Sequence, residues 1–153
     1  MGLWMRVFAL SEATPNPVSL AELVSKLLPG TTCHFGADGN GWFSLEMRPP
    51  TGGPILLDRY GVQEEGIRHD LNTWAAWVET CDYCDEAPAL MERIIQSQQF
   101  ITMRRSLDTP DESGVERLCS GICRHLATCL DGIWQSDDEG LSSADVTLLL
   151  REF

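Results

Sequence analysis

The sequence predicts a single α+β domain, with a mostly antiparallel sheet built from two βαββ units and two helices inserted between them. Near each end of the chain, an apolar strand precedes a capped amphipathic helix and a pair of strands, in halves that span approximately residues 1–60 and 98–153. The segment between them, approximately 64–97, has helical periodicity. A chain of 153 residues with 43% hydrophobic content is sufficient for one core. We expect six or seven strands, with the helices on one face.

The first half begins with a predicted strand at Trp4–Leu10. A helix is expected from Ser19, because Ser19–Glu22 has the pattern of a capping box. Pro29 and Gly30 end this helix. Two strands flank the turn Ala37–Gly41, whose Asp, Gly and Asn residues tolerate positive φ, and Ile55–Asp58 is expected to form another strand.

The middle segment is predicted to be helical. Apolar residues recur at a period of 3.6 over Gly66–Cys81, which indicates one amphipathic helix. A break follows at Asp82–Glu86, and Pro88 suits the first turn of a second helix. The chain then continues into a strand at Gln99–Arg105.

That strand opens the second half. Ser113–Glu116 forms another capping-box pattern, and a helix is predicted from there to about Leu130, with Cys119 and Cys129 near the centre of its inner face. After this helix, Ile133–Gln135 is expected to pair with Val146–Arg151.

Composition and charge exclude some partners. The formal net charge is −12, and so acidic a surface repels phosphate backbones, which argues against nucleic-acid binding and favours a basic protein partner. No apolar run approaches the ~20 residues that span a bilayer, so no membrane partner is expected. The segment Met1–Leu10 is interrupted by Arg6 and is interpreted as a strand rather than a signal peptide. We therefore predict a cytoplasmic protein whose six cysteines are reduced.

The Cys81/Cys84 pair is the sharpest chemical motif. Cys81 and Cys84 stand in a Cys-x-x-Cys spacing that suits zinc or redox chemistry, and Cys119 and Cys123 have the spacing to supply two further ligands. The helical wheel opposes a four-cysteine site, because cysteines on an apolar helix face are usually small buried hydrophobes. We therefore predict no metal and no cofactor. The alternative is a metal site formed by these four cysteines.

Trp77, Asp137, Asp138 and Glu139 are the candidate residues for binding a partner. Trp77 lies about 90° from the centre of the buried face of its helix, either in a second packing surface or at a contact site. The three consecutive acids occupy a predicted hairpin loop, where carboxylates are usually solvated and where a divalent cation is the alternative.

The whole chain resembles small acidic bacterial proteins of an uncharacterised family. The stretches Leu71–Trp77 and Ala144–Leu150 carry this resemblance, which implies no catalytic residues. In architecture, two βαββ units are similar to the GyrI-like effector-binding fold, and this similarity implies a small molecule held between the halves. The helices at Gly66–Ser97 are an insertion relative to that pattern.

The sequence predicts a non-enzymatic cytosolic binding or interaction protein, such as an acidic immunity-type protein that neutralises a basic toxin domain. One alternative is a small-molecule-binding domain with a pocket lined by Trp42, Trp74, Trp77 or Trp134. A second alternative is a zinc- or thiol-dependent protein that uses the Cys81/Cys84 pair. Exposed edge strands also make a homodimer a plausible assembly.

Overall fold

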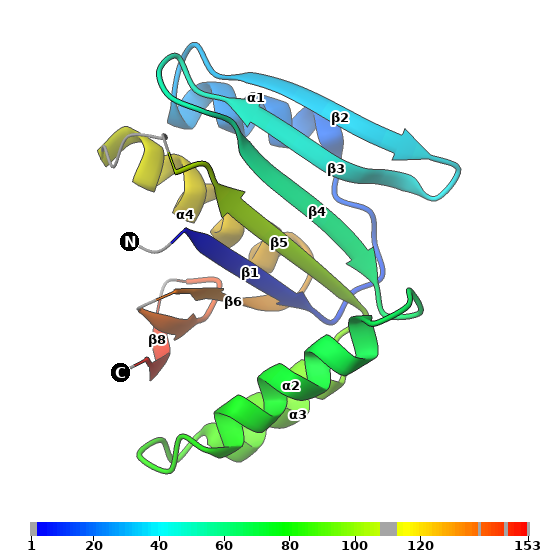
Figure 1. The fold of residues 1–153 in the computed structure, drawn as a ribbon, viewed down its shortest axis with the longest axis vertical. Coiled ribbons are helices and arrows are strands. Elements are labelled where there is room, and N and C mark those ends of the chain that lie inside the picture. Colours follow the sequence, from blue (N-terminus) through cyan, green and yellow to red (C-terminus); the bar gives the residue numbers. More distant parts are fainter. Residues whose placement is uncertain (1–2, 108–112, 138, 146, 153) are drawn as a thin grey trace.

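The structure, a computed structural model, describes residues 3–107, 113–137, 139–145 and 147–152. It confirms the α+β prediction: a single sheet has the strand order β2-β3-β4-β5-β1-β6-β7-β8, and every pair of neighbours is antiparallel (Figure 1). The strands are β1 (Trp4–Ala9), β2 (Thr32–Asp38), β3 (Gly41–Arg48), β4 (Ile55–Gly61), β5 (Gln99–Arg105), β6 (Gly132–Ser136), β7 (Gly140–Ser142) and β8 (Leu148–Arg151).

Helices cover both faces of this sheet, so the expectation of helices on one face is wrong. Two of them, α1 (Pro17–Leu27) and α4 (Ser113–Cys129), lie behind the sheet in Figure 1, whereas α2 (Ile67–Glu79) and α3 (Ala87–Ile95) lie at its lower end. Side chains alternate along a strand, and each face of β1 joins a different core cluster: Val7 packs in the cluster of α1 and α4, and Phe8 in that of α2 and α3. The inserted helix pair has its own apolar side and buries it on the second face.

The start of α1 corrects the predicted capping box at Ser19–Glu22. The N-cap is Asn16, whose Oδ1 accepts hydrogen bonds from the backbone N–H groups of Val18 (2.9 Å) and Ser19 (3.2 Å). Pro17 follows in the first turn, where its fixed φ suits a helix and no N–H is needed. Ser19 therefore lies inside the helix, because Asn-Pro is the stronger start signal. In α4, the side chain of Ser113 lies outside the described part of the structure.

The strands of the second half pair differently from the prediction. β6 pairs with β1 and β7, and β8 pairs with β7 rather than with β6. The additional short strand begins at Gly140, which has a φ of 125°, and a Cβ there would collide with the carbonyl oxygen of Leu150. Each half consequently follows its helix with three strands, which gives eight strands in the described residues rather than six or seven.

The outermost strands of the sheet are β2 and β8. A homodimer that pairs such edges stays a prediction. Within the described residues, none of the helices is both long and apolar enough to cross a bilayer.

The cap geometry predicts unequal effects of two nearby substitutions. Asn16→Ala removes the acceptor of two backbone N–H groups and is expected to lower the free energy of unfolding by about 1 kcal/mol. Ser19→Ala, the matched control within the same helix, should change it by less than about 0.5 kcal/mol. Urea denaturation of both variants measures the difference. A larger effect for Ser19→Ala would indicate that Ser19, and not Asn16, caps this helix.

Candidate functional site

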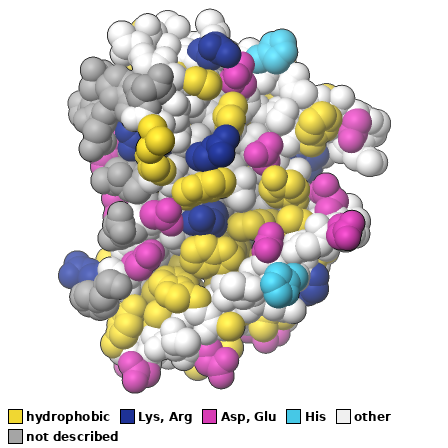
Figure 2. All heavy atoms as spheres, in the orientation of Figure 1, with side chains coloured by type: hydrophobic (Ala, Val, Ile, Leu, Met, Phe, Trp, Pro, Cys, Tyr) yellow, Lys and Arg dark blue, Asp and Glu magenta, His cyan; other side chains and the backbone are white. Residues whose placement is uncertain are grey.

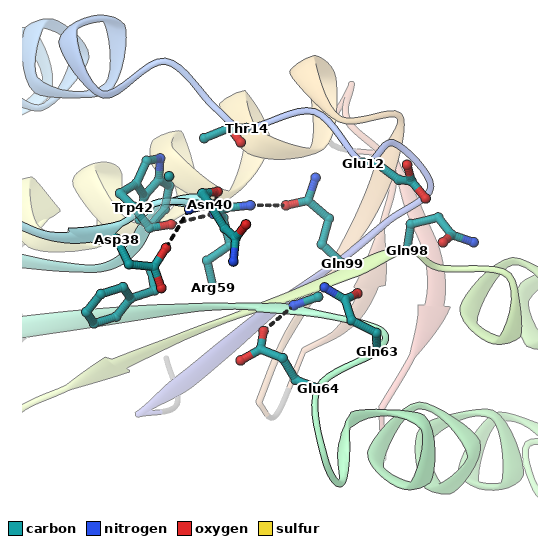
Figure 3. A pocket seen from close by; sticks show the side chains of 13 residues that line it. Glu12, Thr14, Asp38, Asn40, Trp42, Arg59, Gln63, Glu64, Gln98 and Gln99 are labelled. Atoms are coloured by element: carbon teal, nitrogen blue, oxygen red, sulfur yellow. Dashed lines mark hydrogen bonds between the residues drawn. The ribbon is translucent and has the colours of Figure 1, made fainter.

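The candidate site is a polar cavity of about 510 Å³ at the end of the sheet where β4 ends and β5 begins (Figure 3). Its wall combines the loop after β1, the turn between β2 and β3, and the loop after β4. The lining residues are Glu12, Thr14, Asp38, Asn40, Gly41, Trp42, Phe43, Arg59, Gly61, Gln63, Glu64, Gln98 and Gln99. We call this cavity the polar pocket.

Arg59 lies at the centre of the polar pocket and is bonded to neutral acceptors. Its Nε donates to the carbonyl oxygen of Trp42 (2.7 Å), Nη1 to Oε1 of Gln99 (3.2 Å) and Nη2 to the carbonyl oxygen of Asn40 (3.2 Å). The guanidinium carbon is 5.4 Å from the centroid of the Trp42 ring. Burial lowers the pKa of Arg59, and the nearby charges of Glu64 and Asp38 oppose that shift. Because arginine stays protonated in proteins, the site retains this cation.

Gln99 connects the pocket to the loop after β1. Its side chain is 2% exposed, and Nε2 donates to the carbonyl oxygens of Ser11 (2.6 Å) and Ala13 (2.7 Å). Further along this loop, the indole N–H of Trp42 donates to the carbonyl oxygen of Pro15 (2.8 Å). These bonds fix the loop as a wall and satisfy polar groups that burial would otherwise make costly.

Gly41 permits the turn and the loop to approach closely. Its φ is 101°, and a Cβ there would lie 2.9 Å from a side-chain atom of Thr14 and 3.1 Å from a guanidinium nitrogen of Arg59. A larger residue would strain the backbone and push against the wall of the pocket.

Carboxylates outnumber the guanidinium around the polar pocket, since Glu12, Asp38 and Glu64 face a single arginine among the lining residues. Glu64 accepts a hydrogen bond from the backbone N–H of Gly61, and Asp38 accepts one from that of Asn40. The formal charge of the lining is therefore negative, which favours cations over anions.

Neutral groups complete the lining. The side chains of Asn40, Gln63 and Gln98 offer amide donors and acceptors, and the ring of Phe43 is 47% exposed. Together these groups suit a small polar ligand that is held by several hydrogen bonds and one aromatic contact.

Two of the predicted partner-binding residues lie in one network away from this pocket. Nη1 of Arg6 donates to Oδ1 of Asp137 (2.8 Å), and the guanidinium carbon of Arg6 is 4.7 Å from the ring centroid of Trp74. The Trp74 ring in turn contacts that of Trp77, with centroids 5.5 Å apart. Glu139 is exposed in the turn between β6 and β7, and Asp138 lies outside the described residues.

The four tryptophans proposed as pocket residues do not surround one cavity. Trp42 lines the polar pocket, while Trp74 and Trp77 border the core cluster of α2 and α3. Trp134 is 5% exposed, and its indole N–H donates to the carbonyl oxygen of Ser143 (3.1 Å).

The two cysteine pairs lie on opposite faces of the sheet, so they cannot form the four-cysteine site that their spacing permits. Cys81 and Cys84 belong to the α2 and α3 side, whereas Cys119 and Cys123 lie on α4 and are buried in the core cluster of α1 and α4. The Sγ atoms of Cys81 and Cys84 each approach a backbone carbonyl oxygen at 3.5 Å, that of Trp77 and of Leu149 respectively. Among the described residues, no group of three or more His, Cys, Asp or Glu side chains is arranged to hold a metal.

The inner face of α4 differs from the predicted one. Cys123 is 1% exposed and belongs to the core, while Cys129, expected near the centre of that face, is exposed beside His125, with Sγ 3.5 Å from Nε2. The buried face of α4 runs through Leu118, Ile122 and Leu126 and continues to Ala127 and Leu130, so Cys129 lies on the exposed flank of this face. Burial raises the pKa of Cys119 to about 12 and raises that of Cys123 further.

No family model, curated protein or solved structure matches the chain. The resemblance to an uncharacterised acidic family therefore stays a prediction. Sequence reasoning missed Glu12, Arg59, Glu64 and Gln99 as site residues, because each stands alone in a loop or at a strand end without a chemical motif. Their grouping follows from strand register. The one available signal was Gln99, a polar residue at the start of an apolar strand.

The role of Gln99 predicts a specific loss of stability. Gln99→Leu removes the donor to the carbonyl oxygens of Ser11 and Ala13 and the acceptor of Arg59, and should lower the free energy of unfolding by about 1–2 kcal/mol. Gln98→Leu is the matched control, because the Gln98 amide donates only a local bond to Gln96. Equal urea midpoints for the two variants would contradict this account.

Thiol accessibility is expected to differ sharply along α4. Iodoacetamide should alkylate exposed Cys129 in the native protein, while Cys119 and Cys123 react only after unfolding, because burial raises their pKa and blocks access. Mass spectrometry of tryptic peptides after timed labelling measures this order, with Cys129→Ser as the control. Labelling of Cys123 before Cys129 would refute the placement of α4.

Proposed function

We propose that the protein is a non-enzymatic binding protein whose polar pocket holds a small, hydrogen-bonding cation. One observation carries this proposal: Glu12, Asp38 and Glu64 line a cavity in which the guanidinium of Arg59 is already bonded to neutral acceptors. Because Arg59 contributes one positive charge against three negative ones, a cation gains electrostatic attraction there and an anion meets repulsion.

The other lining groups narrow the ligand chemistry. The amides of Asn40, Gln63 and Gln98 both donate and accept hydrogen bonds, as hydroxyl groups require. The half-exposed ring of Phe43 offers an apolar surface for the carbon skeleton of a ligand. An amine that also carries hydroxyl groups matches all three properties, and the cavity of about 510 Å³ lies within the range of roughly 300–1,000 Å³ usual for small-ligand sites.

A basic protein partner is the second candidate. The net charge of −12 would attract it, and the exposed Phe43 ring beside the acidic lining suits a protein surface that presents lysine or arginine. In this version, which keeps the neutraliser hypothesis, a basic side chain of the partner enters the polar pocket instead of a free ligand.

A charge series of one sugar frame tests the proposal. Glucosamine, glucose and glucuronate carry one positive, no and one negative charge on similar polyol skeletons. We expect chemical-shift changes of the Trp42 indole N–H to saturate at the lowest concentration for glucosamine and at the highest for glucuronate. Glucuronate binding as tightly as glucosamine would refute the cationic preference. No shift with any sugar would leave the protein partner as the better proposal.

Charge-removing variants localise the effect. Glu12→Gln and Glu64→Gln should each weaken glucosamine binding about threefold, since a partly exposed charge pair contributes roughly 0.2–1 kcal/mol. Glu79→Gln removes the same charge from exposed helix α2, outside the polar pocket, and should leave the affinity unchanged. Equal weakening by all three variants would show that only the net charge matters.

A further inference from the structure

We propose a second binding site, for a small amphiphilic anion such as a medium-chain carboxylate, at the opposite end of β4 and β5. A groove of about 450 Å³ lies there, lined by Leu3, Trp4, Pro54, Leu56, Arg104, Arg105, Ser106 and Leu107. We call it the apolar groove. It shares no lining residue with the polar pocket, so the two proposals stand or fall separately.

Strand register builds the floor of the apolar groove. Arg104 of β5 is paired with Leu56 of β4 on one side and with Trp4 of β1 on the other. Directly paired residues point to the same face of a sheet, so these three side chains form one row with the cation in the middle. This face is the one that α2 and α3 cover only at its lower end. Figure 2 shows hydrophobic and basic side chains alternating along the middle of this face, with acidic side chains to either side of them.

Exposed leucines border this row. Leu3 is 40% exposed and Leu107 is 88% exposed, and both line the apolar groove together with Pro54. Large aliphatic side chains in water are unremarkable singly, but two beside one cavity indicate a surface that an apolar ligand would dehydrate.

The ring of Trp4 contacts the guanidinium of Arg104. The guanidinium carbon of Arg104 is 5.6 Å from the ring centroid of Trp4, whose ring also lies 5.4 Å from the guanidinium carbon of Arg6. This cation–π contact restricts the arginine side chain, and a guanidinium binds a carboxylate through two parallel hydrogen bonds. None of the ion pairs within the described residues involves Arg104.

Charge and apolar surface together specify the ligand. The hydrocarbon part would lie on Leu56 and Trp4, and the carboxylate would face Arg104. The acidic polar pocket does not repel the bound carboxylate. The seven-residue strands β4 and β5, at about 3.3 Å per residue, separate the two sites by roughly 20 Å. This separation exceeds the Debye length of about 8 Å at physiological salt.

Three eight-carbon probes of different charge test the proposal: octanoate, octanol and octylamine. With the full chain, we expect the indole N–H signal of Trp4 to shift at the lowest concentration of octanoate and at the highest of octylamine. Arg104→Gln should remove the preference for octanoate over octanol, about threefold in affinity. Arg124→Gln makes the same change in net charge at an exposed position of α4 and should preserve that preference. Circular dichroism verifies that both variants fold.

Three outcomes would overturn the proposal. Octanol and octanoate binding equally well would remove the role of charge. An unchanged preference in Arg104→Gln would place the anion elsewhere. The third outcome combines two results: sedimentation shows a dimer that octanoate does not dissociate, and dilution of the protein alone shifts the Trp4 signal. These results would assign the apolar groove to a second copy of the chain.

Discussion

The position of β5 between β4 and β1 is the constraint on which the rest of the structure depends. β5 comes from the second half of the chain, yet both of its neighbours come from the first, with registers from Ile55↔Arg105 to Gly61↔Gln99 and from Trp4↔Arg104 to Ala9↔Gln99. The two halves are thus interlocked in one sheet. A slip by one residue would transfer every β5 side chain to the opposite core cluster, so burial on both faces enforces this register.

The same register generates both candidate sites. Arg59 pairs with Ile101, and Gln99 pairs with Gly61, so Arg59 and Gln99 are diagonal neighbours on one face. Their hydrogen bond forms the base of the polar pocket. Five residues further along β5, Arg104 faces the other side of the sheet between Leu56 and Trp4. One pair of strands therefore presents an acidic, hydrogen-bonding cavity at one end and a basic, apolar groove at the other.

Local signals in the sequence were sufficient for the helices and the longer strands, but not for the shortest strand or for the pairing of the strands. Gln99–Arg105 was predicted with the bounds that the structure gives, because its apolar residues and flanks are local evidence. The three-residue strand β7 was missed, because so short a strand has no periodicity of its own and depends on β6 and β8 for its hydrogen bonds. The polar pocket was missed because Glu12, Arg59 and Gln99 are far apart in sequence, and only the fold brings them together. Cys129 was misplaced because the helical wheel centred the buried face on Cys119 and Cys129, whereas the buried face of α4 includes Cys123, Ala127 and Leu130.

Trp77 and Asp137, two of the predicted partner-binding residues, take part in one network of contacts within the chain. Asp137 pairs with Arg6, which lies against Trp74, and Trp74 packs on Trp77, so the side chains that suggested an interface already satisfy one another within the chain. Beyond the end of α2, none of the described helices covers this face of the sheet. Contacts between arginine and tryptophan side chains cover it there instead of buried aliphatic side chains. The cation–π contacts continue from Arg6 through Trp4 to Arg104 and end at the apolar groove. A ligand at Arg104 would therefore contact the last residue in a series of cation–π and edge-to-face contacts that reaches α2.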